Sequence, residues 1–198
     1  ADYQDAEDTQ QRDVPHGQIF RFELSSEGSE FYDGFDPTLK DENMHPFSRR
    51  IDVYVPAQYI DGTPAPLLVV HDGPGYVGVV STTLDNLIAA GKLPKIVTVF
   101  VNHGGGDSIG SERGLEYDTM SDKYTRFVEA EVLPAVLENG DVAAAYPNLT
   151  FISHPEGRSA MGCSSGGAAA LAMGWFRPDL YRRIITFSGT FVDQQNPE

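Results

Sequence analysis

The sequence predicts an α/β fold with three layers, in which helices cover both faces of a mostly parallel sheet. Two continuous apolar runs, at 67–71 and 96–101, are typical of strands buried on both faces of a parallel sheet. A helical stretch at 82–90 lies between them, so strand and helix alternate along the chain. Alternation of this kind indicates βαβ units, whose right-handed crossovers place helices on both faces of the sheet.

Two more strands are expected before the first apolar run. Residues 18–24 alternate polar and apolar side chains, which predicts a strand that buries one face. Residues 25–48 are rich in Gly, Asp, Ser and Pro and predict a long loop, whose acidic side chains are expected to be solvated rather than to bind calcium. The alternation returns at 50–55, and Pro56 ends that strand.

The second half of the chain continues the pattern. Residues 121–138 predict the clearest helix, with Ser121 as its cap and with Pro134 expected to kink or tighten its end. A short strand at 159–163, a small apolar helix at 165–173 and a buried strand at 183–188 follow.

Length and composition indicate one globular domain. The chain has 198 residues, of which 40% are hydrophobic, and we interpret 1–17 as a loose N-terminal arm and 18–198 as the domain, through about its sixth core strand. The formal charge of −15 disfavours nucleic acid and membranes as partners. The polar start lacks a methionine, which suggests a trimmed precursor or a recombinant start rather than an intact signal peptide, and a secreted or periplasmic location is favoured over a cytoplasmic one.

The motif that indicates chemistry is G-x-S-x-G at 162–166, with Ser164 at its centre. A strand precedes it and a helix follows, which is the context of a nucleophile elbow. Glycines at both ends leave room for a tight bend that exposes the Ser164 hydroxyl, so we predict that Ser164 is the nucleophile. The alternative is a structural turn that packs the helix on the sheet. The neighbouring Cys163 is interpreted as a small buried hydrophobe.

An oxyanion hole needs two backbone N–H donors. One is expected from Ser165, the residue after the nucleophile. Two glycine-rich loops compete for the other, and the order of strands favours 72–76 over the loop after the second apolar run. Because proline in that loop has no N–H, the predicted donor is Gly75 or Tyr76, with Gly73 as the weaker alternative.

Several motifs follow one another in a characteristic order between about residues 48 and 192. They lie at 50–56, 67–73, 113–117, 127–134, 162–167 and 178–181. In these segments the sequence resembles the enterochelin esterase and esterase D-like group of α/β-hydrolases, which also contains feruloyl and acetyl-xylan esterases.

The resemblance implies an α/β-hydrolase fold and a Ser, acid, His triad in that chain order, without a metal or an organic cofactor. It implies hydrolysis of carboxylic esters through an acyl-enzyme, often on siderophores, plant-wall sugars or small acyl thiols. Ser164 corresponds to the nucleophile, and Ser165 with the 73–76 loop corresponds to the oxyanion region. Arg113 and Glu116 match the R-x-x-E-Y segment near the mouth of the site, where they contact substrate or form a local pair that shapes the loop.

The acid and the histidine of that triad are expected after the elbow, but no histidine lies beyond residue 154. We therefore expect the C-terminal part of the fold to be missing and the acid and the base to come from a longer chain or from a second chain. Recruitment of another histidine, or loss of catalysis, are the alternatives. His71 and His103 end their strands at the edge where open sheets bind ligands, so both are candidates to line the site. Asp193 follows the last strand and is a candidate acid.

The function predicted from the sequence is that of a serine esterase acting on a small-molecule or carbohydrate ester. The alternatives are a non-catalytic module that binds a carbohydrate or a siderophore, and an acyltransferase that uses the same serine.

Overall fold

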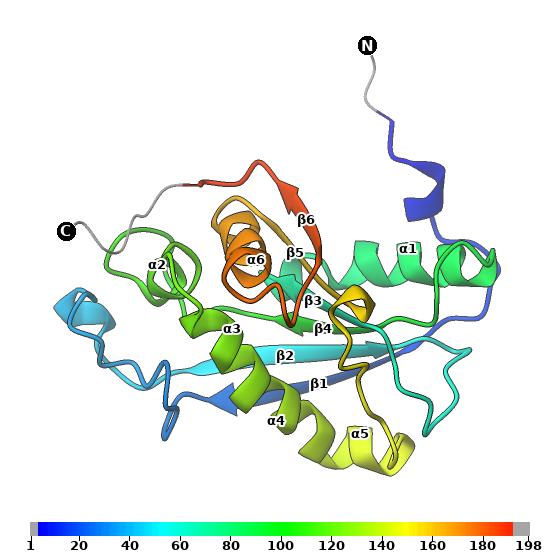
Figure 1. The fold of residues 1–198 in the computed structure, drawn as a ribbon, viewed down its shortest axis with the longest axis horizontal. Helices are drawn as coiled ribbons and strands as arrows, with labels where there is room; N and C mark the ends of the chain where they lie inside the picture. The colour runs from blue at the N-terminus through cyan, green and yellow to red at the C-terminus, as the bar shows by residue number, and fades with distance from the viewer. Residues whose placement is uncertain (1–3, 192–198) are drawn as a thin grey trace.

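The computed structural model describes residues 4–191. Its sheet consists of β1 (Gln18–Ser25), β2 (Ser48–Val55), β3 (Leu67–His71), β4 (Val97–Val101), β5 (Arg158–Cys163) and β6 (Arg183–Phe187). The strands lie in the order β1-β2-β4-β3-β5-β6 (Figure 1). β4, β3, β5 and β6 are parallel, whereas β2 is antiparallel to both β1 and β4. This arrangement confirms the predicted mostly parallel sheet.

Helices cover both faces of this sheet. They are α1 (Val77–Ala89), α2 (Glu112–Tyr117), α3 (Lys123–Phe127), α4 (Leu133–Glu138), α5 (Gly140–Ala145) and α6 (Ser165–Phe176). In β3, Leu68 and Val70 pack with α1, while Leu67 and Val69 pack into the larger core with the other helices. The side chains of β3 therefore alternate between two cores, which explains its uninterrupted apolar sequence.

Some helices differ from the sequence prediction. The helix expected at 121–138 is interrupted by a π-helical turn over Val128–Val132, because Pro134 has no N–H with which to continue the α-helical ladder. The predicted cap is displaced by one residue, because α3 begins at Lys123 with Asp122 at the N-cap position and without a side-chain capping bond. Ser121, one residue earlier, accepts the N–H of Lys123 at its Oγ at 3.2 Å. Helices α2 and α5 were not predicted, and α1 begins five residues earlier than expected.

The last strand is not buried as predicted. Within residues 4–191, β6 pairs only with β5 and forms an edge of the sheet. Ile185 is 46% exposed and Phe187 is 47% exposed, because no strand or helix of the described residues covers this side of β6.

The N-terminal segment, expected to be a loose arm, lies against α1. Asn86 Nδ2 donates to the carbonyl oxygens of Asp8 and Gln10, at 2.8 Å each. Asp85 Oδ1 accepts the N–H of Gly17 at 2.8 Å. The sequence of the segment gave no sign of this, because the polar side chains that it satisfies belong to α1.

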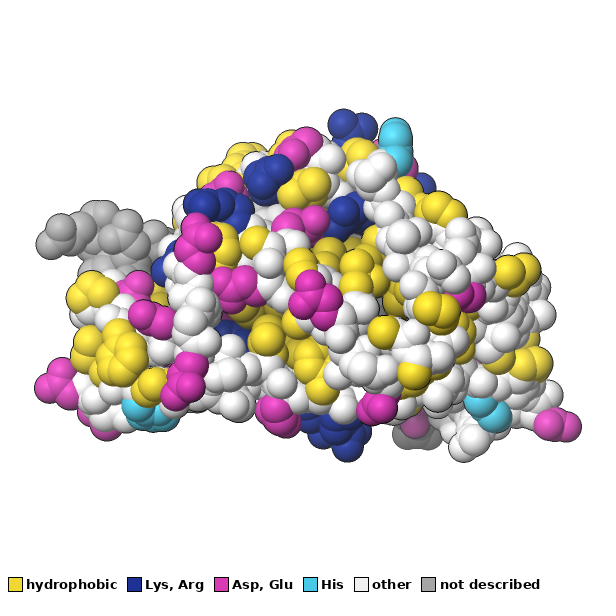
Figure 2. Space-filling model, turned by 90° about the horizontal axis from the view of Figure 1, so that it is seen from below, with side chains coloured by type: hydrophobic (Ala, Val, Ile, Leu, Met, Phe, Trp, Pro, Cys, Tyr) yellow, Lys and Arg dark blue, Asp and Glu magenta, His cyan; other side chains and the backbone are white. Residues whose placement is uncertain are grey.

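The surface matches the acidic composition. On the face shown in Figure 2, acidic side chains are spread among hydrophobic ones. None of the helices within residues 4–191 combines the length and the apolar character needed to cross a bilayer. The same residues bring together no group of three or more His, Cys, Asp or Glu side chains that could hold a metal ion.

Candidate active site

Ser164 lies at the bend between β5 and α6, at the carboxyl end of the strand. Its backbone has φ 55° and ψ −128°, which an L-residue rarely adopts, and the residue is exposed. A Cβ on Gly162 would collide with the backbone carbonyl of Gly166. The two glycines therefore permit the bend that presents this hydroxyl above the sheet.

Backbone hydrogen bonds hold the bend in place. The N–H of Ser164 donates to the carbonyl of Phe187 at 3.0 Å, and its own carbonyl accepts the N–H of Gly167 at 2.9 Å. As the first residue of α6, Ser165 has an N–H without an intrahelical acceptor. Such an N–H, at the positive end of the helix dipole, favours a negative charge beside it.

Cys163 differs from the prediction of a buried hydrophobe. It is half-buried rather than fully buried. The reason is its place as the last residue of β5, where the chain leaves the sheet for the bend at Ser164.

The loop over 72–76 lies beside the elbow, as predicted. Its parent strand β3 pairs with β5, and a Cβ on Gly166 would lie only 2.7 Å from Asp72 Oδ2. Asp72 itself has a left-handed backbone, with φ 54° and ψ 38°. The site therefore consists of two neighbouring loops with unusual backbone conformations at the same edge of the sheet.

The N–H groups expected to complete the oxyanion hole are used inside this loop. Gly75 N–H donates to the carbonyl of Asp72 at 3.1 Å, and Tyr76 N–H donates to that of Gly73 at 2.9 Å. The reason is the left-handed Asp72, which closes a 3₁₀ turn directly after the strand. The N–H of Gly73 donates to none of the described backbone acceptors, so Gly73 is the remaining donor candidate in this loop.

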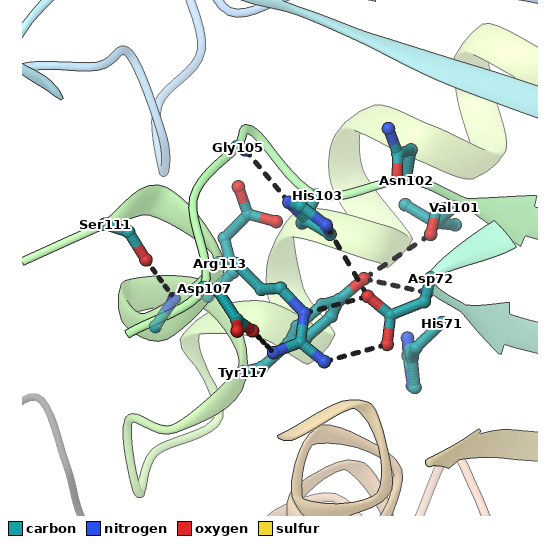
Figure 3. A network of polar contacts seen from close by, with 12 residues as sticks. His71, Asp72, Val101, Asn102, His103, Gly105, Asp107, Ser111, Arg113 and Tyr117 are labelled. Atoms are coloured by element: carbon teal, nitrogen blue, oxygen red, sulfur yellow. Dashed lines mark hydrogen bonds and ion pairs between the residues drawn. The ribbon is translucent and has the colours of Figure 1, made fainter. Parts of the chain in front are cut away.

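The R-x-x-E-Y segment is helix α2, and its arginine holds the neighbouring loop (Figure 3). Arg113 donates from Nε to Asp72 Oδ1 at 2.9 Å and from Nη2 to Asp72 Oδ2 at 3.1 Å. The remaining terminal nitrogen donates to Asp107 at 2.9 Å. Arg113 is thus engaged with protein carboxylates in this structure rather than being free for a substrate.

Glu116 does not contact the site surface, in contrast to the prediction. Its side chain has no exposed area, and Oε2 accepts a hydrogen bond of 2.7 Å from Arg49. Oε1 accepts the N–H of Gly104 at 3.0 Å. The alternative of an Arg113–Glu116 pair is also wrong, because each residue pairs with a partner from another part of the chain.

The two histidines at the strand ends have different environments. His71 is fully buried beside the Tyr124 hydroxyl, so it does not line the site as predicted, and burial lowers its pKa to about 4. His103 is 21% exposed, with Nε2 at 3.6 Å from Asp72 Oδ1. Burial lowers the pKa of His103, although Asp72 opposes that shift. Asp193 lies outside the described residues.

Two residues that the sequence prediction did not assign connect these loops. Asp72 joins Arg113 to the elbow, and the Tyr117 hydroxyl accepts the N–H of Asp72 at 3.1 Å. The only local signal for Asp72 was its place between a strand end and a Gly-Pro turn, where a left-handed residue is common. Tyr117 gave no such signal.

Comparisons with known proteins agree with this fold. A family model described as "Putative esterase" matches residues 44–197. A solved ferulic acid esterase has 21% identity and a TM-score of 0.58, over 88% of this chain and 59% of that one. The ferric enterobactin esterase from Salmonella typhimurium has 19% identity and a TM-score of 0.63, over 90% of this chain and 38% of its own.

A ferulic acid esterase from the anaerobic fungus Anaeromyces mucronatus has 15% identity and a TM-score of 0.61, over 91% of this chain and 62% of its own. The chain thus spans less than two thirds of these solved structures. At these identities the likeness shows the fold alone. No curated protein matches the chain.

Proposed function

The chain belongs to the esterase family, and from this premise we propose that it hydrolyses carboxylic esters with Ser164 as the nucleophile. The observation that supports this most directly is the exposed hydroxyl on a strained bend, at the start of α6 and beside the loop after β3. A serine in an unfavourable conformation over the end of a parallel sheet is the arrangement expected of a nucleophile elbow.

In the proposed reaction, Ser164 Oγ attacks the ester carbonyl and its proton passes to a general base. The tetrahedral oxyanion accepts hydrogen bonds from the N–H groups of Ser165 and Gly73. Gly73 takes the place of Gly75 and Tyr76, whose N–H groups are bonded within the loop. The base gives this proton to the departing alcohol, which leaves an acyl-enzyme. Water, deprotonated by the same base, then attacks the acyl-enzyme, and the proton returns to Ser164 Oγ as the acid is released. Neither a metal nor an organic cofactor takes part in this scheme.

The base in this proposal comes from outside the described residues. Within 4–191, no histidine is hydrogen-bonded to Ser164, and the two nearest to the sheet edge have other partners. We propose that a C-terminal segment or a second chain supplies the acid and the histidine.

The proposed substrate is a small-molecule or carbohydrate ester. Solved structures with this fold are named as esterases of ferulic acid and of ferric enterobactin. The net charge of −15 favours neutral or cationic esters over strongly anionic ones.

A fluorophosphonate probe tests this proposal on the complete protein, because such probes phosphonylate an activated serine. We expect mass spectrometry to find the adduct on Ser164, labelling to disappear in Ser164→Ala, and Ser159→Ala in β5 to keep it. Folded protein that hydrolyses esters but carries no adduct on Ser164 would contradict the assignment.

A non-catalytic binding module is the second candidate, because no described histidine is bonded to Ser164. Binding of methyl ferulate without turnover, equal in wild type and Ser164→Ala, would favour it. Acyl transfer is distinguished by product analysis with an added alcohol, which would yield a new ester in place of the free acid.

A further inference from the structure

We propose that Asp72 and Arg113 are positioning residues, which hold the oxyanion loop (72–76) against the nucleophile elbow (162–166). The proposal rests on the proposed function and deepens it. It assigns to the arginine of α2 a role through Asp72 rather than a contact with substrate.

The first step concerns the backbone of Asp72, which is left-handed although the residue is not glycine. This conformation is uncommon and persists where surrounding contacts maintain it. Its N–H donates to the Tyr117 hydroxyl, which in turn lies 3.4 Å from the carbonyl of Val101 (Figure 3). Its carboxylate accepts hydrogen bonds from two of the three guanidinium nitrogens of Arg113, Nε and Nη2. The start of the oxyanion loop is thus fixed from the backbone and from the side chain.

The second step concerns the rigidity of Arg113. Its side chain is only 10% exposed, and its guanidinium carbon lies 5.4 Å from the centre of the Tyr117 ring. Its backbone N–H donates to the carbonyl of Gly105 at 2.9 Å, which ties α2 to the loop after β4. A bidentate guanidinium fixes both the distance and the plane of the carboxylate that it binds.

The third step links this pair to the elbow. The Asp72 carboxylate occupies the space beside Gly166 where any other residue would place its Cβ. The pair therefore sets how closely the oxyanion loop approaches the start of α6, and with it the spacing between the N–H groups of Gly73 and Ser165. A displacement of about 1 Å in such a site can lower a rate by about 100-fold.

Charge gives the pair a second effect. Asp72 is 23% exposed at the edge where the proposed oxyanion develops. A carboxylate without its partner would repel that charge, and Arg113 neutralises it. His103 Nε2, at 3.6 Å from the same carboxylate, adds a weaker polar contact.

The test compares Asp72→Asn, Arg113→Lys and Arg113→Gln in the complete protein. Asparagine tolerates the left-handed backbone and lysine keeps the positive charge, so each variant removes the bidentate bond with little other change. We expect both to lower the rate of Ser164 labelling by a fluorophosphonate, and kcat for p-nitrophenyl acetate, by about 10- to 100-fold. KM should change by less than about threefold, because the loss falls on the transition state.

Two comparisons separate positioning from simple stabilisation. Arg113→Gln should be slower than Asp72→Asn, because it leaves the carboxylate unpaired, and the Asp72→Asn/Arg113→Lys double variant should be no slower than the slower of its single variants. The matched control is the bidentate pair of Arg177 and Asp179, with bonds of 3.0 and 2.7 Å on the surface. Arg177→Lys and Asp179→Asn should stay within about twofold of wild type.

Labelling within twofold of wild type in a folded Asp72→Asn or Arg113→Lys variant would overturn the positioning role and leave the esterase proposal intact. If only one of Asp72→Asn and Arg113→Lys folds, the labelling rate of that variant is sufficient to decide the test. Wild-type protein that is never labelled on Ser164 would overturn both proposals.

Discussion

Replacing Ser164 by glycine should stabilise the protein while it removes the proposed nucleophile. At φ 55° and ψ −128°, a residue with a Cβ lies in a sparsely populated region, at a cost of about 1–3 kcal/mol. Glycine removes that cost but loses about 0.5–1 kcal/mol through the greater freedom of the unfolded chain. The balance favours glycine over alanine at this position by about 1 kcal/mol.

The comparison uses Ser164→Gly and Ser164→Ala, because both lack the hydroxyl and differ only in the Cβ. For a chain of 198 residues, about 1 kcal/mol corresponds to a rise in Tm of about 2–4 °C. Thermal unfolding followed by circular dichroism measures it. Ser48, exposed at the start of β2, gives a control pair in which glycine should be the less stable variant. A Ser164→Gly variant no more stable than Ser164→Ala would refute the strain at the elbow.

Three further substitutions test the structure around the site. Burial, reinforced by Glu116, raises the pKa of Glu112 to about 7, so the folded state binds its proton more tightly than the unfolded state and loses stability as pH rises from about 4.5 to 7. Glu112→Gln should therefore exceed wild type in urea unfolding by less than about 1 kcal/mol at pH 5 and by up to about 3 kcal/mol at pH 8, and equal curves at both pH values would contradict this. Gly162→Ala should prevent folding or lower Tm by more than 5 °C (about 2 kcal/mol or more), since its Cβ meets the Gly166 carbonyl, and a native-like Tm would disprove the packing of the elbow. Asn86→Ala should release the N-terminal segment and speed its cleavage by trypsin, whereas unchanged cleavage would show that the two hydrogen bonds do not hold it.

Local sequence determined the framework of this protein. Alternating and continuous apolar runs were sufficient to predict all six strands and their largely parallel arrangement, because the apolar pattern of a strand is written in consecutive residues. The elbow was also predictable, because the tight bend at Ser164 has no room for side chains at Gly162 and Gly166, and both glycines lie within the same five residues. The π-helical turn before Pro134 was foreseen only as a kink, because the sequence shows the missing N–H but not how the ladder adjusts.

The polar contacts of the site were decided by the tertiary structure. Arg113 and Glu116, neighbours on α2, bind partners 41 and 67 positions away, Asp72 and Arg49. A buried charge requires a partner wherever the packing of strands brings one, and spacing along the chain does not reveal that partner. The same holds for the amides of the loop after β3, whose use inside a turn depends on the left-handed Asp72. The sequence thus specified the sheet and the bend at Ser164, whereas the ion pairs that join the loops depend on distances that only the folded chain sets.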